Sequence, residues 1–252
     1  MITRRSASEL AKMRRSGQVV ADVLRQVTEK VQPGATTWDL EETADAVIRQ
    51  HAATSAFRGY HGFPCVLCAS VNEQVIHGIP SRKRVLKAGE IVSLDCGVVL
   101  NGYYADHATT VVVGPCDQVP APVQKLMRVT QQALVEGIEQ ARVGNRLGDI
   151  CHAVQQRAEG EGFSVVREFV GHGIGTHLHE DPQVPNYGEA GKGVKLREGM
   201  VLAIEPMLNQ GAAGVQLLSD GWTAVTADGG ASAHFEHTVA ITKDGPWILT
   251  QP

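Results

Sequence analysis

The clearest pattern of apolar and polar positions lies between residues 90 and 113, EIVSLDCGVVLNGYYADHATTVVV. Two runs of apolar and small residues flank Asn101-Gly102. This dipeptide between such runs is a strong hairpin signal, because both turn residues must take positive φ. The stretch therefore predicts two antiparallel strands joined by a two-residue turn. In that register the numbers of facing residues add up to 203, which places Asp106 opposite Gly97.

Each predicted strand of this hairpin carries one aspartate. Asp95 lies two residues from Gly97, and residues two apart on a strand share a face, so Asp95 and Asp106 are expected to be diagonal neighbours. Two unpaired buried carboxylates are strongly destabilising. No Lys or Arg lies within the hairpin, so the pattern favours a metal ion between the two acids. The alternative is that one or both aspartates lie at a solvent-facing strand end.

Four helices are predicted from capping signals and from the Gly and Pro residues between them. Ser6 and Glu9 have the spacing of a capping box. The predicted helices cover residues 6 to about 31, 37 or 39 to 48, about 122 to 142, and 147 to about 160. A short strand is expected over residues 66–71, and the chain from Phe163 onward is expected to be strand, loop and turn.

An internal repeat relates two parts of the chain at an offset of 110 residues. Residues 86–95 and 196–205 share the pattern L-[KR]-x-G-x-[IV]-x-x-[LI]-[DE]. The same offset relates Gly34, Asp39 and Leu40 to Gly144, Asp149 and Ile150. We therefore expect two similar α-β halves, joined near residues 114–122. A pseudo-two-fold axis would bring the terminal acids of the two patterns, Asp95 and Glu205, to the middle of the molecule.

The composition is that of a globular enzyme-sized protein: 252 residues, 43% hydrophobic and 20% charged. A net charge of −4 and only 5% aromatic residues argue against sequence-specific binding of nucleic acid. No apolar segment follows Arg4 and Arg5 as in a signal peptide, and no run approaches 18 apolar residues. We therefore expect a cytoplasmic protein with no membrane partner.

The five cysteines are an odd number, which argues against a disulfide framework. Cys65 and Cys68 have the spacing of half a zinc site, but no second pair of cysteines completes it. The sequence therefore predicts free, partly buried thiols.

Four carboxylates and one imidazole form a candidate metal-ligand set: Asp95, Asp106, His172, Glu205 and Glu236. His172 lies in a Gly-His-Gly-Ile-Gly segment, whose glycines allow a close approach of the backbone. Glu236 lies in a strand-like run, and an exposed strand-end acid is the alternative there. These ligands suit Mn, Fe, Co or Zn in a two-metal site. The sequence contains neither the HExxH nor the GxSxG signature of other hydrolases.

The chain resembles the type I methionine aminopeptidases, in their short bacterial form. The resemblance covers nearly the whole chain. Besides Asp95 and Asp106, it rests on Gly59-Tyr-His-Gly-Phe-Pro64, Ser70-Val-Asn-Glu73, His77-Gly-Ile-Pro80, Gly171-His-Gly-Ile-Gly175, His179-Glu-Asp-Pro-Gln183, Ile204-Glu-Pro-Met207, Asp220-Gly-Trp222 and Glu236-His-Thr238. It implies an α+β pita-bread fold, with two pseudo-two-fold-related α-β halves around a central antiparallel sheet. One catalytic domain would span residues 1–252, with halves of about 1–115 and 120–252.

The resemblance also implies an activity: removal of the N-terminal methionine from nascent proteins whose second residue is small. The five ligands would hold two divalent ions, Co, Mn, Fe or Zn, which share an attacking hydroxide. Asp106 and Glu236 would contact both ions, and Glu205 would also move protons. His77 and His179 would hydrogen-bond the substrate, with His179 on the carbonyl oxygen of the scissile bond.

Two further sets of positions follow from the resemblance. The methionine pocket would be lined by Tyr60, Phe63, Cys68, Leu178 and Trp222. A monovalent cation would be held by backbone oxygens of Asn72, Gln74 and Ser232.

The chain departs from the commoner family pattern at His107, which follows a ligand, and at Phe63 and Leu178, which keep the pocket apolar. His177 would be a surface residue or part of the substrate rim.

Two rival interpretations and one additional partner accompany this interpretation. A Xaa-Pro aminopeptidase or a prolidase would share the fold, but these enzymes usually carry an extra N-terminal domain. A non-enzymatic binding member of the fold would usually lack metal ligands. A ribosome contact through RNA phosphates competes with a merely solvated basic surface. The basic residues concerned are Arg4, Arg5, Lys12, Arg14, Arg15, Arg82, Lys83, Arg84 and Lys87.

Overall fold

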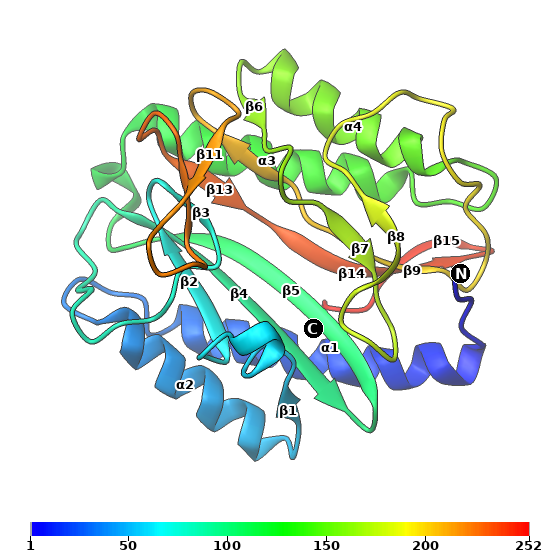
Figure 1. Cartoon of the computed structure of the whole chain (residues 1–252), viewed down its shortest axis with the longest axis horizontal. Helices are drawn as coiled ribbons and strands as arrows, with labels where there is room; N and C mark the ends of the chain where they lie inside the picture. Colours follow the sequence, from blue (N-terminus) through cyan, green and yellow to red (C-terminus); the bar gives the residue numbers. More distant parts are fainter. Residues whose placement is uncertain (1, 252) are drawn as a thin grey trace.

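The computed structural model describes residues 2–251 and is built around one large antiparallel sheet. Its strands are β1 (Thr54–Ser55), β2 (Leu67–Val71), β4 (Ile91–Leu100), β5 (Tyr103–Val112), β7 (Gly171–Gly173), β8 (Glu180–Val184), β9 (Val201–Ile204), β14 (Glu236–Thr242) and β15 (Gly245–Ile248). Their order is β1-β4-β5-β14-β9-β7-β8, with β2 paired to β4 and β15 paired to β14 (Figure 1).

Two small sheets and the helices complete the described fold. The small sheets are formed by β13-β10-β6 and by β11-β12-β3. Their strands are β3 (Gln74–Ile76), β6 (Ser164–Val165), β10 (Met207–Asn209), β11 (Val215–Leu217), β12 (Ala224–Thr226) and β13 (Ser232–His234). The helices are α1 (Ala7–Thr28), α2 (Thr37–Gln50), α3 (Ala121–Glu139) and α4 (Leu147–Gly160), with short 3₁₀ turns η1 (Tyr60–Gly62) and η2 (Cys116–Gln118).

The predicted hairpin is confirmed by the pairing of β4 with β5. Gly97 faces Asp106, and Asp95 faces Ala108. The turn residues Asn101 and Gly102 take φ values of +52° and +78°. This conformation is open to Gly and tolerated by Asn, which explains why this dipeptide sets the register.

The four predicted helices are present, with ends that differ by a few residues. The capping box is confirmed, because the Ser6 N–H donates to Glu9 Oε2 at 2.8 Å and the Ser6 side chain accepts from the Glu9 N–H. Helix α1 ends at Thr28, before the predicted end near residue 31. Among the described residues, no helix combines the length and apolar character needed to cross a bilayer.

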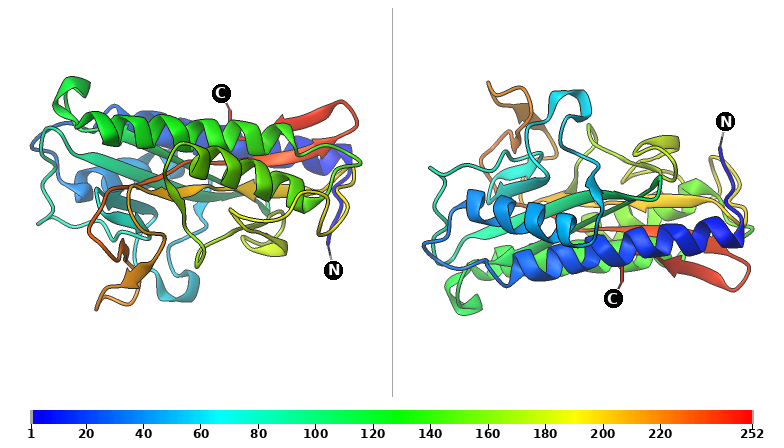
Figure 2. Two further views of the ribbon diagram at one scale, coloured as in Figure 1. Left: turned by 90° about the horizontal axis from the view of Figure 1, so that it is seen from above. Right: turned by 90° about the horizontal axis from the view of Figure 1, so that it is seen from below.

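The helices lie on one face of the large sheet, and the small sheet β11-β12-β3 lies on the other, whereas the sheet β13-β10-β6 packs beside α3 and α4 (Figure 2). Helix α1 packs on β4 and β5, and α3 packs on β9, β14 and β15. Helix α2 packs beside α1, and α4 packs beside α3, so each half contributes one helix pair. The helices thereby bury one face of the sheet, and the other face is left for side chains that the loops and the sheet β11-β12-β3 surround.

The 110-residue repeat recurs in main-chain contacts of the structure. Isolated bridges pair Thr36 with Val85 and Arg146 with Lys195, and each residue of the second pair is 110 positions beyond its counterpart. The Gly34 N–H donates to the Leu86 carbonyl, and Gly144 makes the same bond to the Leu196 carbonyl. Equivalent bonds at one offset show that the two halves share a local fold.

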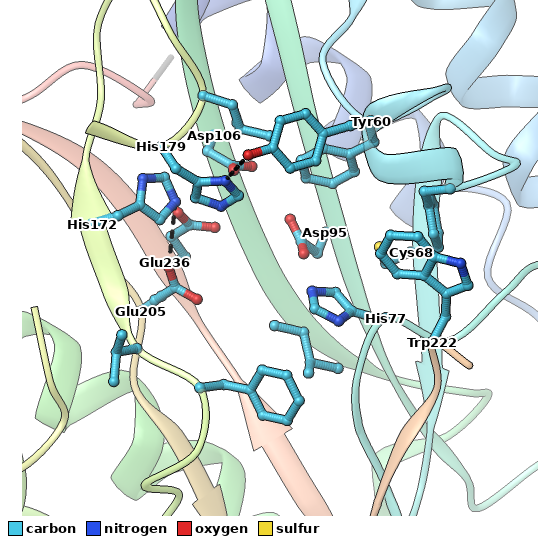
Figure 3. A pocket seen from close by; sticks show the side chains of 16 residues that line it. Tyr60, Cys68, His77, Asp95, Asp106, His172, His179, Glu205, Trp222 and Glu236 are labelled. Atoms are coloured by element: carbon cyan, nitrogen blue, oxygen red, sulfur yellow. Dashed lines mark hydrogen bonds and ion pairs between the residues drawn. The ribbon is translucent and has the colours of Figure 1, made fainter. Parts of the chain in front are cut away.

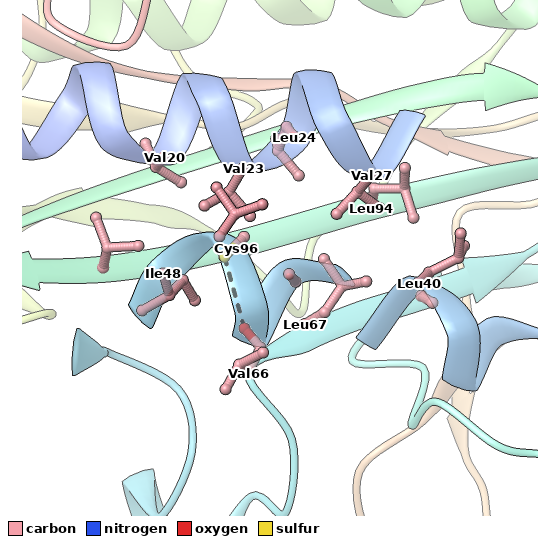
Figure 4. Packing of buried hydrophobic residues seen from close by; sticks show 14 of the residues in the cluster. Val20, Val23, Leu24, Val27, Leu40, Ile48, Val66, Leu67, Leu94 and Cys96 are labelled. Carbon is pink, nitrogen blue, oxygen red and sulfur yellow. Dashed lines mark hydrogen bonds between the residues drawn. The ribbon is translucent and has the colours of Figure 1, made fainter. Parts of the chain in front are cut away.

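Each half has its own apolar core. In the N-terminal half, Val20, Val23 and Leu24 of α1 pack against Leu94 of β4 and Leu67 of β2 (Figure 4). Burying an aliphatic side chain of this size stabilises the fold by about 1.5–3 kcal/mol. The second core lies between α3, α4 and the strands β9 and β14. The two cores fix the strands that carry the acids described next.

The cysteines are free thiols, as predicted. Those at positions 65, 68, 96 and 151 are buried, but Cys116 is exposed in the turn η2, so the prediction of partial burial is wrong for that residue.

Candidate metal centre

A row of facing residues crosses the large sheet and carries the predicted acids. Cys68 faces Asp95, Asp95 faces Ala108, and Ala108 faces Glu236. Facing residues on neighbouring strands project from the same side of a sheet. Glu205 directly follows Ile204, which is the partner of His237, so Glu205 continues the row beside Glu236. The methyl group of Ala108 leaves room above the middle of the row.

The five predicted ligands converge on one cavity. Asp106, His172 and Glu236 each offer a ligand atom, and these atoms lie within 4.8 Å of one another. His172 Nε2 is 3.6 Å from Glu205 Oε1, and Asp95 lines the same cavity. All five side chains are buried. In Figure 3, Glu205, Glu236 and His172 lie at one end of the cavity, Cys68 and Trp222 lie at the other, and Asp95 lies between them.

The buried acids are held in an environment that disfavours negative charge. Burial raises the pKa of Asp106 from 3.8 to about 7. Burial and neighbouring carboxylates also hold the pKa values of Asp95, Glu205 and Glu236 well above their ordinary range. Among the described residues, Asp95 Oδ1 and Glu236 Oε1 are buried with no hydrogen-bond partner. Such atoms destabilise a fold unless a cation satisfies them.

His172 can bind a metal ion through Nε2. Its Nδ1 lies 2.9 Å from the Gly173 carbonyl oxygen, which can only accept, so Nδ1 carries the hydrogen. Burial, and then the nearby His179, lower the pKa of His172 to about 3, which keeps the ring neutral. The Nε2 lone pair therefore faces the Glu205 carboxylate at 3.6 Å. Two acceptors at that separation repel each other unless a proton or a metal ion lies between them.

Three further histidines surround the site, and the sequence-based interpretation assigned no role to them. His107 and His237 follow ligands on β5 and β14, so they project from the reverse face of the sheet. Their rings stack with centroids 4.5 Å apart, and His107 Nδ1 hydrogen-bonds the carbonyl oxygen of Glu236. His234 Nε2 lies 3.9 Å from Glu205 Oε2. Burial lowers the pKa of His234 to about 3, so this neighbour is neutral.

His77 and His179 lie beside the acids, as the resemblance implies. The Tyr60 hydroxyl is 2.6 Å from His179 Nδ1. The His77 ring packs edge-on against Phe169 and Trp222, at centroid distances of 5.4 and 6.0 Å. Burial, and then His179, lower the pKa of His77 to about 4. His77 also has φ +60°, an uncommon conformation outside glycine that points to a functional constraint.

The cavity has an apolar end that could accept one side chain. Its volume is about 170 Å³, smaller than the roughly 300–1,000 Å³ of pockets for drug-sized ligands. All five residues predicted for the methionine pocket line it: Tyr60, Phe63, Cys68, Leu178 and Trp222. The sequence did not single out four other lining residues, Phe57, Ile76, Phe169 and Val170. Only the apolar character of the segment before Gly171 offered a signal for the last two.

The residues proposed to hold a monovalent cation also lie close together. The Ser232 N–H donates to the Asn72 carbonyl at 2.9 Å, and the Gln74 side chain accepts from the Val71 N–H at 2.8 Å. Asn72 has φ +54°. The first contact joins β13 to the turn between β2 and β3, and the cation itself stays a prediction.

Several residues of the predicted basic surface are engaged within the protein. Arg5 pairs with Glu180, Arg82 with Glu42, and Arg84 with Glu90. The Arg14 guanidinium donates to carbonyl oxygens near the C-terminus. His177 is exposed and precedes the cavity-lining Leu178 in the chain, which fits either of its predicted roles. The ribosome contact stays a prediction, and fewer free charges support it than the sequence indicates.

Comparisons with known proteins place these features in a family. The model of metallopeptidase family M24 matches residues 11–243. Methionine aminopeptidase from Clostridium perfringens is 52% identical over 250 residues, which is 99% of both chains. Methionine aminopeptidase 1 from Bacillus subtilis is 48% identical over the full length of both chains.

Solved structures agree with the sequence comparisons. The crystal structure of methionine aminopeptidase from Thermotoga maritima superposes with a TM-score of 0.97, at 46% identity and over 100% of each chain. Prolidase from Pyrococcus horikoshii matches with a TM-score of 0.79 at 21% identity, over 98% of this chain and 63% of that chain. The second likeness concerns the fold alone.

Proposed function

Because the chain belongs to metallopeptidase family M24 and, within it, to the methionine aminopeptidases, we propose that it removes the N-terminal methionine from polypeptides whose second residue is small. The predicted fold class is confirmed: this is the pita-bread fold, with two related α-β halves around a curved antiparallel sheet. The whole chain, residues 1–252, would form one catalytic domain, with halves of about 1–115 and 120–252.

The proposed metal ligands are Asp95, Asp106, His172, Glu205 and Glu236. They would hold two divalent ions (Co, Mn, Fe or Zn), with Asp106 and Glu236 in contact with both. When bound there, such ions would supply a water of lowered pKa for attack on the first peptide carbonyl near neutral pH. The orphaned oxygens of Asp95 and Glu236 support this assignment, since each lacks any other partner among the described residues.

The other residues would orient the substrate and move protons. If the Tyr60 hydroxyl donates to His179 Nδ1, the hydrogen of a neutral His179 lies on Nε2, ready to donate to the carbonyl oxygen of the scissile bond. His77 would hydrogen-bond the substrate from the opposite wall. Glu205 would carry a proton from the attacking water to the leaving amine, as the resemblance implies.

The apolar end of the cavity would take the methionine side chain. An unbranched thioether fits a narrow apolar cavity with little strain. The edge-on pair Phe63 and Trp222, with centroids 5.1 Å apart, forms one wall, and Cys68 lies among them. The resemblance implies that the residue after the methionine is small.

One observation carries the proposal most strongly. The His172 Nε2 lone pair and the Glu205 carboxylate face each other at 3.6 Å, inside a buried group of four acids. No described Lys or Arg pairs with these acids to offset their charge. A metal centre explains how this buried group of acids is tolerated.

The test is an assay on purified protein stripped of metal and reloaded with each divalent ion in turn. Release of methionine from Met-Ala-Ser, with little cleavage of Ala-Pro peptides, is the expected result. The His172→Ala variant is expected to bind less metal and to lose activity at limiting metal. Equal cleavage of both peptides, or full activity without any divalent ion, would refute the proposal.

Three lesser parts of the proposal need their own tests. The substrates would be nascent chains in the cytoplasm, and a ribosome contact would appear as salt-sensitive co-sedimentation with ribosomes. A monovalent cation at Asn72, Gln74 and Ser232 would appear as a rise in thermal stability with K⁺ or Na⁺ over a bulky organic cation.

A further inference from the structure

The segment before α1 reaches the loop that borders the cavity. Arg5 precedes the helix N-cap, and its side chain is only 7% exposed. Its guanidinium Nη2 donates to both carboxylate oxygens of Glu180, at 2.6 Å to Oε2. Glu180 is the first residue of β8, 175 positions along the chain. Figure 1 shows the loop between β7 and β8 extending toward α1.

Glu180 in turn holds the loop by its main chain. Its Oε1 accepts from the Thr176 N–H at 2.8 Å and from the His177 N–H at 3.2 Å. These residues belong to the loop between β7 and β8, which presents Leu178 and His179 to the cavity. One carboxylate therefore links the N-terminal segment to the residues that would touch the substrate.

Two glycines allow the N-terminal segment to dock at this point. A Cβ at Gly175 would collide with the Arg5 guanidinium, and a Cβ at Gly199 would collide with the Arg5 main chain. The Arg5 N–H donates to the Gly199 carbonyl at 2.6 Å. Gly175, the last glycine of the Gly-His-Gly-Ile-Gly segment, thus leaves space for the Arg5 guanidinium. This is separate from any role of the segment in placing His172.

We propose that Arg5 is a positioning residue for the reaction: acting through Glu180, it holds the loop that sets the places of Leu178 and His179. The inference rests on the proposed function and adds to it a residue from the far end of the chain. Removing one partner of a buried ion pair leaves an uncompensated charge, so Glu180 would turn toward water. The loop amides would then lose their acceptor, and His179 would move.

The neighbouring residue Arg4 supplies a matched control. Arg4 is exposed, and its Nε donates to the Glu198 carbonyl at 2.7 Å, without contact to the loop. The hydrogen bonds of the helix cap run between Ser6 and Glu9 themselves, and Arg5 adds only a longer contact, with Nη1 at 3.8 Å from Glu9 Oε1. Arg4→Ala and Arg5→Ala therefore remove the same charge from the same segment, and only the second releases Glu180.

The experiment compares metal-loaded Arg5→Ala, Arg4→Ala and wild-type protein on Met-Ala-Ser. A misplacement of about 1 Å can lower a rate by about 10²-fold. We therefore expect kcat/KM of Arg5→Ala to fall by roughly 10- to 100-fold, mostly in kcat, at unchanged metal content. Arg4→Ala should stay within about twofold of wild type. Guanidinium at millimolar concentration should restore part of the Arg5→Ala activity, and NaCl at equal ionic strength should not.

A second pair of variants separates positioning from general damage to the fold. If Arg5 acts through Glu180, then Arg5→Ala and Glu180→Gln are non-additive, and the double variant is hardly worse than either single variant. Arg5→Lys, which keeps the charge, should recover part of kcat. These readouts serve equally well if Arg5→Ala folds poorly, because Arg5→Lys and Glu180→Gln retain a polar partner at each end.

Hydrogen exchange of the Thr176 and His177 amides reports on the position of the loop without any substrate. The inference predicts faster exchange of these amides in Arg5→Ala and no change in Arg4→Ala. Unchanged exchange, an unchanged kcat/KM, or additive effects of the two substitutions would overturn it. Wild-type protein that cleaves no Met-peptide while these amides stay protected would instead refute the proposed function and leave the Arg5 contact standing.

Discussion

Neutralising a metal ligand should stabilise the metal-free protein. Asp106 is buried among three other acids, and burial raises its pKa from 3.8 to about 7. Without metal, the folded protein must either bind a proton at Asp106 or bury another negative charge. Asp106→Asn removes this charge while keeping nearly the same shape. Its side-chain oxygen can still accept from the His107 N–H, as Asp106 Oδ1 does at 3.0 Å.

The size of the stability change follows from the pKa values of Asp106 in the folded and unfolded states. A folded pKa above the unfolded one means that the folded state holds the proton longer, so stability falls as pH rises from about 4 to about 7. Each pKa unit corresponds to 1.36 kcal/mol, so the penalty above pH 7 is about 4 kcal/mol. We expect Asp106→Asn to recover about 2–4 kcal/mol at pH 8 and almost nothing near pH 4.

The assay is thermal unfolding of metal-stripped wild type and Asp106→Asn between pH 4 and pH 8. The gain at pH 8 corresponds to a rise in Tm of roughly 5–10 °C for a chain of this size. Added divalent metal should raise the Tm of the wild type far more than that of the variant. Comparing wild type with the variant at each pH cancels the titration of groups that lie far from Asp106.

Asp149→Asn is a control with the opposite sign. Asp149 caps α4, and hydrogen bonds from the N–H groups of Arg146 and Gly191 hold its pKa below the ordinary range. Its contribution is therefore present above the unfolded pKa and is lost as pH falls. Asp149→Asn should lower Tm at pH 8. A metal-free Asp106→Asn that is less stable than wild type at pH 8, or a pH-independent difference, would refute the reasoning.

Three other substitutions test the cavity and the core. Tyr60→Phe removes the hydroxyl at His179 Nδ1, so kcat on Met-Ala-Ser should fall about tenfold with KM nearly unchanged, whereas an unchanged kcat would exclude this role of the tyrosine. Trp222→Ala opens the wall shared with Phe63, so KM for Met-peptides should rise and the preference for methionine over longer or bulkier residues should weaken in competition assays. Leu94→Ala leaves a void in the N-terminal core, so denaturant unfolding should show a loss of about 2–5 kcal/mol with unchanged metal stoichiometry.

Local patterns predicted the parts of the fold that depend on near neighbours. The Asn101-Gly102 turn sets the register of β4 and β5, because a two-residue turn leaves one pairing in which the apolar residues share a face. The repeat was visible because both halves keep Gly34 and Gly144 at positive φ before a helix. Such constraints act within a few residues, so they can be recognised in short sequence patterns.

The features that the sequence did not show depend on packing between segments that are far apart in the chain. The row through Ala108 depends on β14 pairing with β5, more than 120 positions away. The stack of His107 on His237 lies behind that pairing, so neither histidine could be assigned from its own segment. The sequence places Arg5 in a basic cluster, and only packing shows it buried against Glu180. The ligand set could be predicted from the sequence because the hairpin and the repeat single out Asp95, Asp106 and Glu205, and the resemblance agrees with all five residues.

Anomalous diffraction from crystals loaded with Mn or Co tests the central claim most directly, namely that five distant side chains bind a pair of cations on one face of the sheet. The account predicts two peaks in the cavity, each about 2.0–2.3 Å from an oxygen of Asp106 and of Glu236, with His172 Nε2 on one of them. Two peaks that avoid Asp106, or no peak in the cavity at saturating metal, would contradict it.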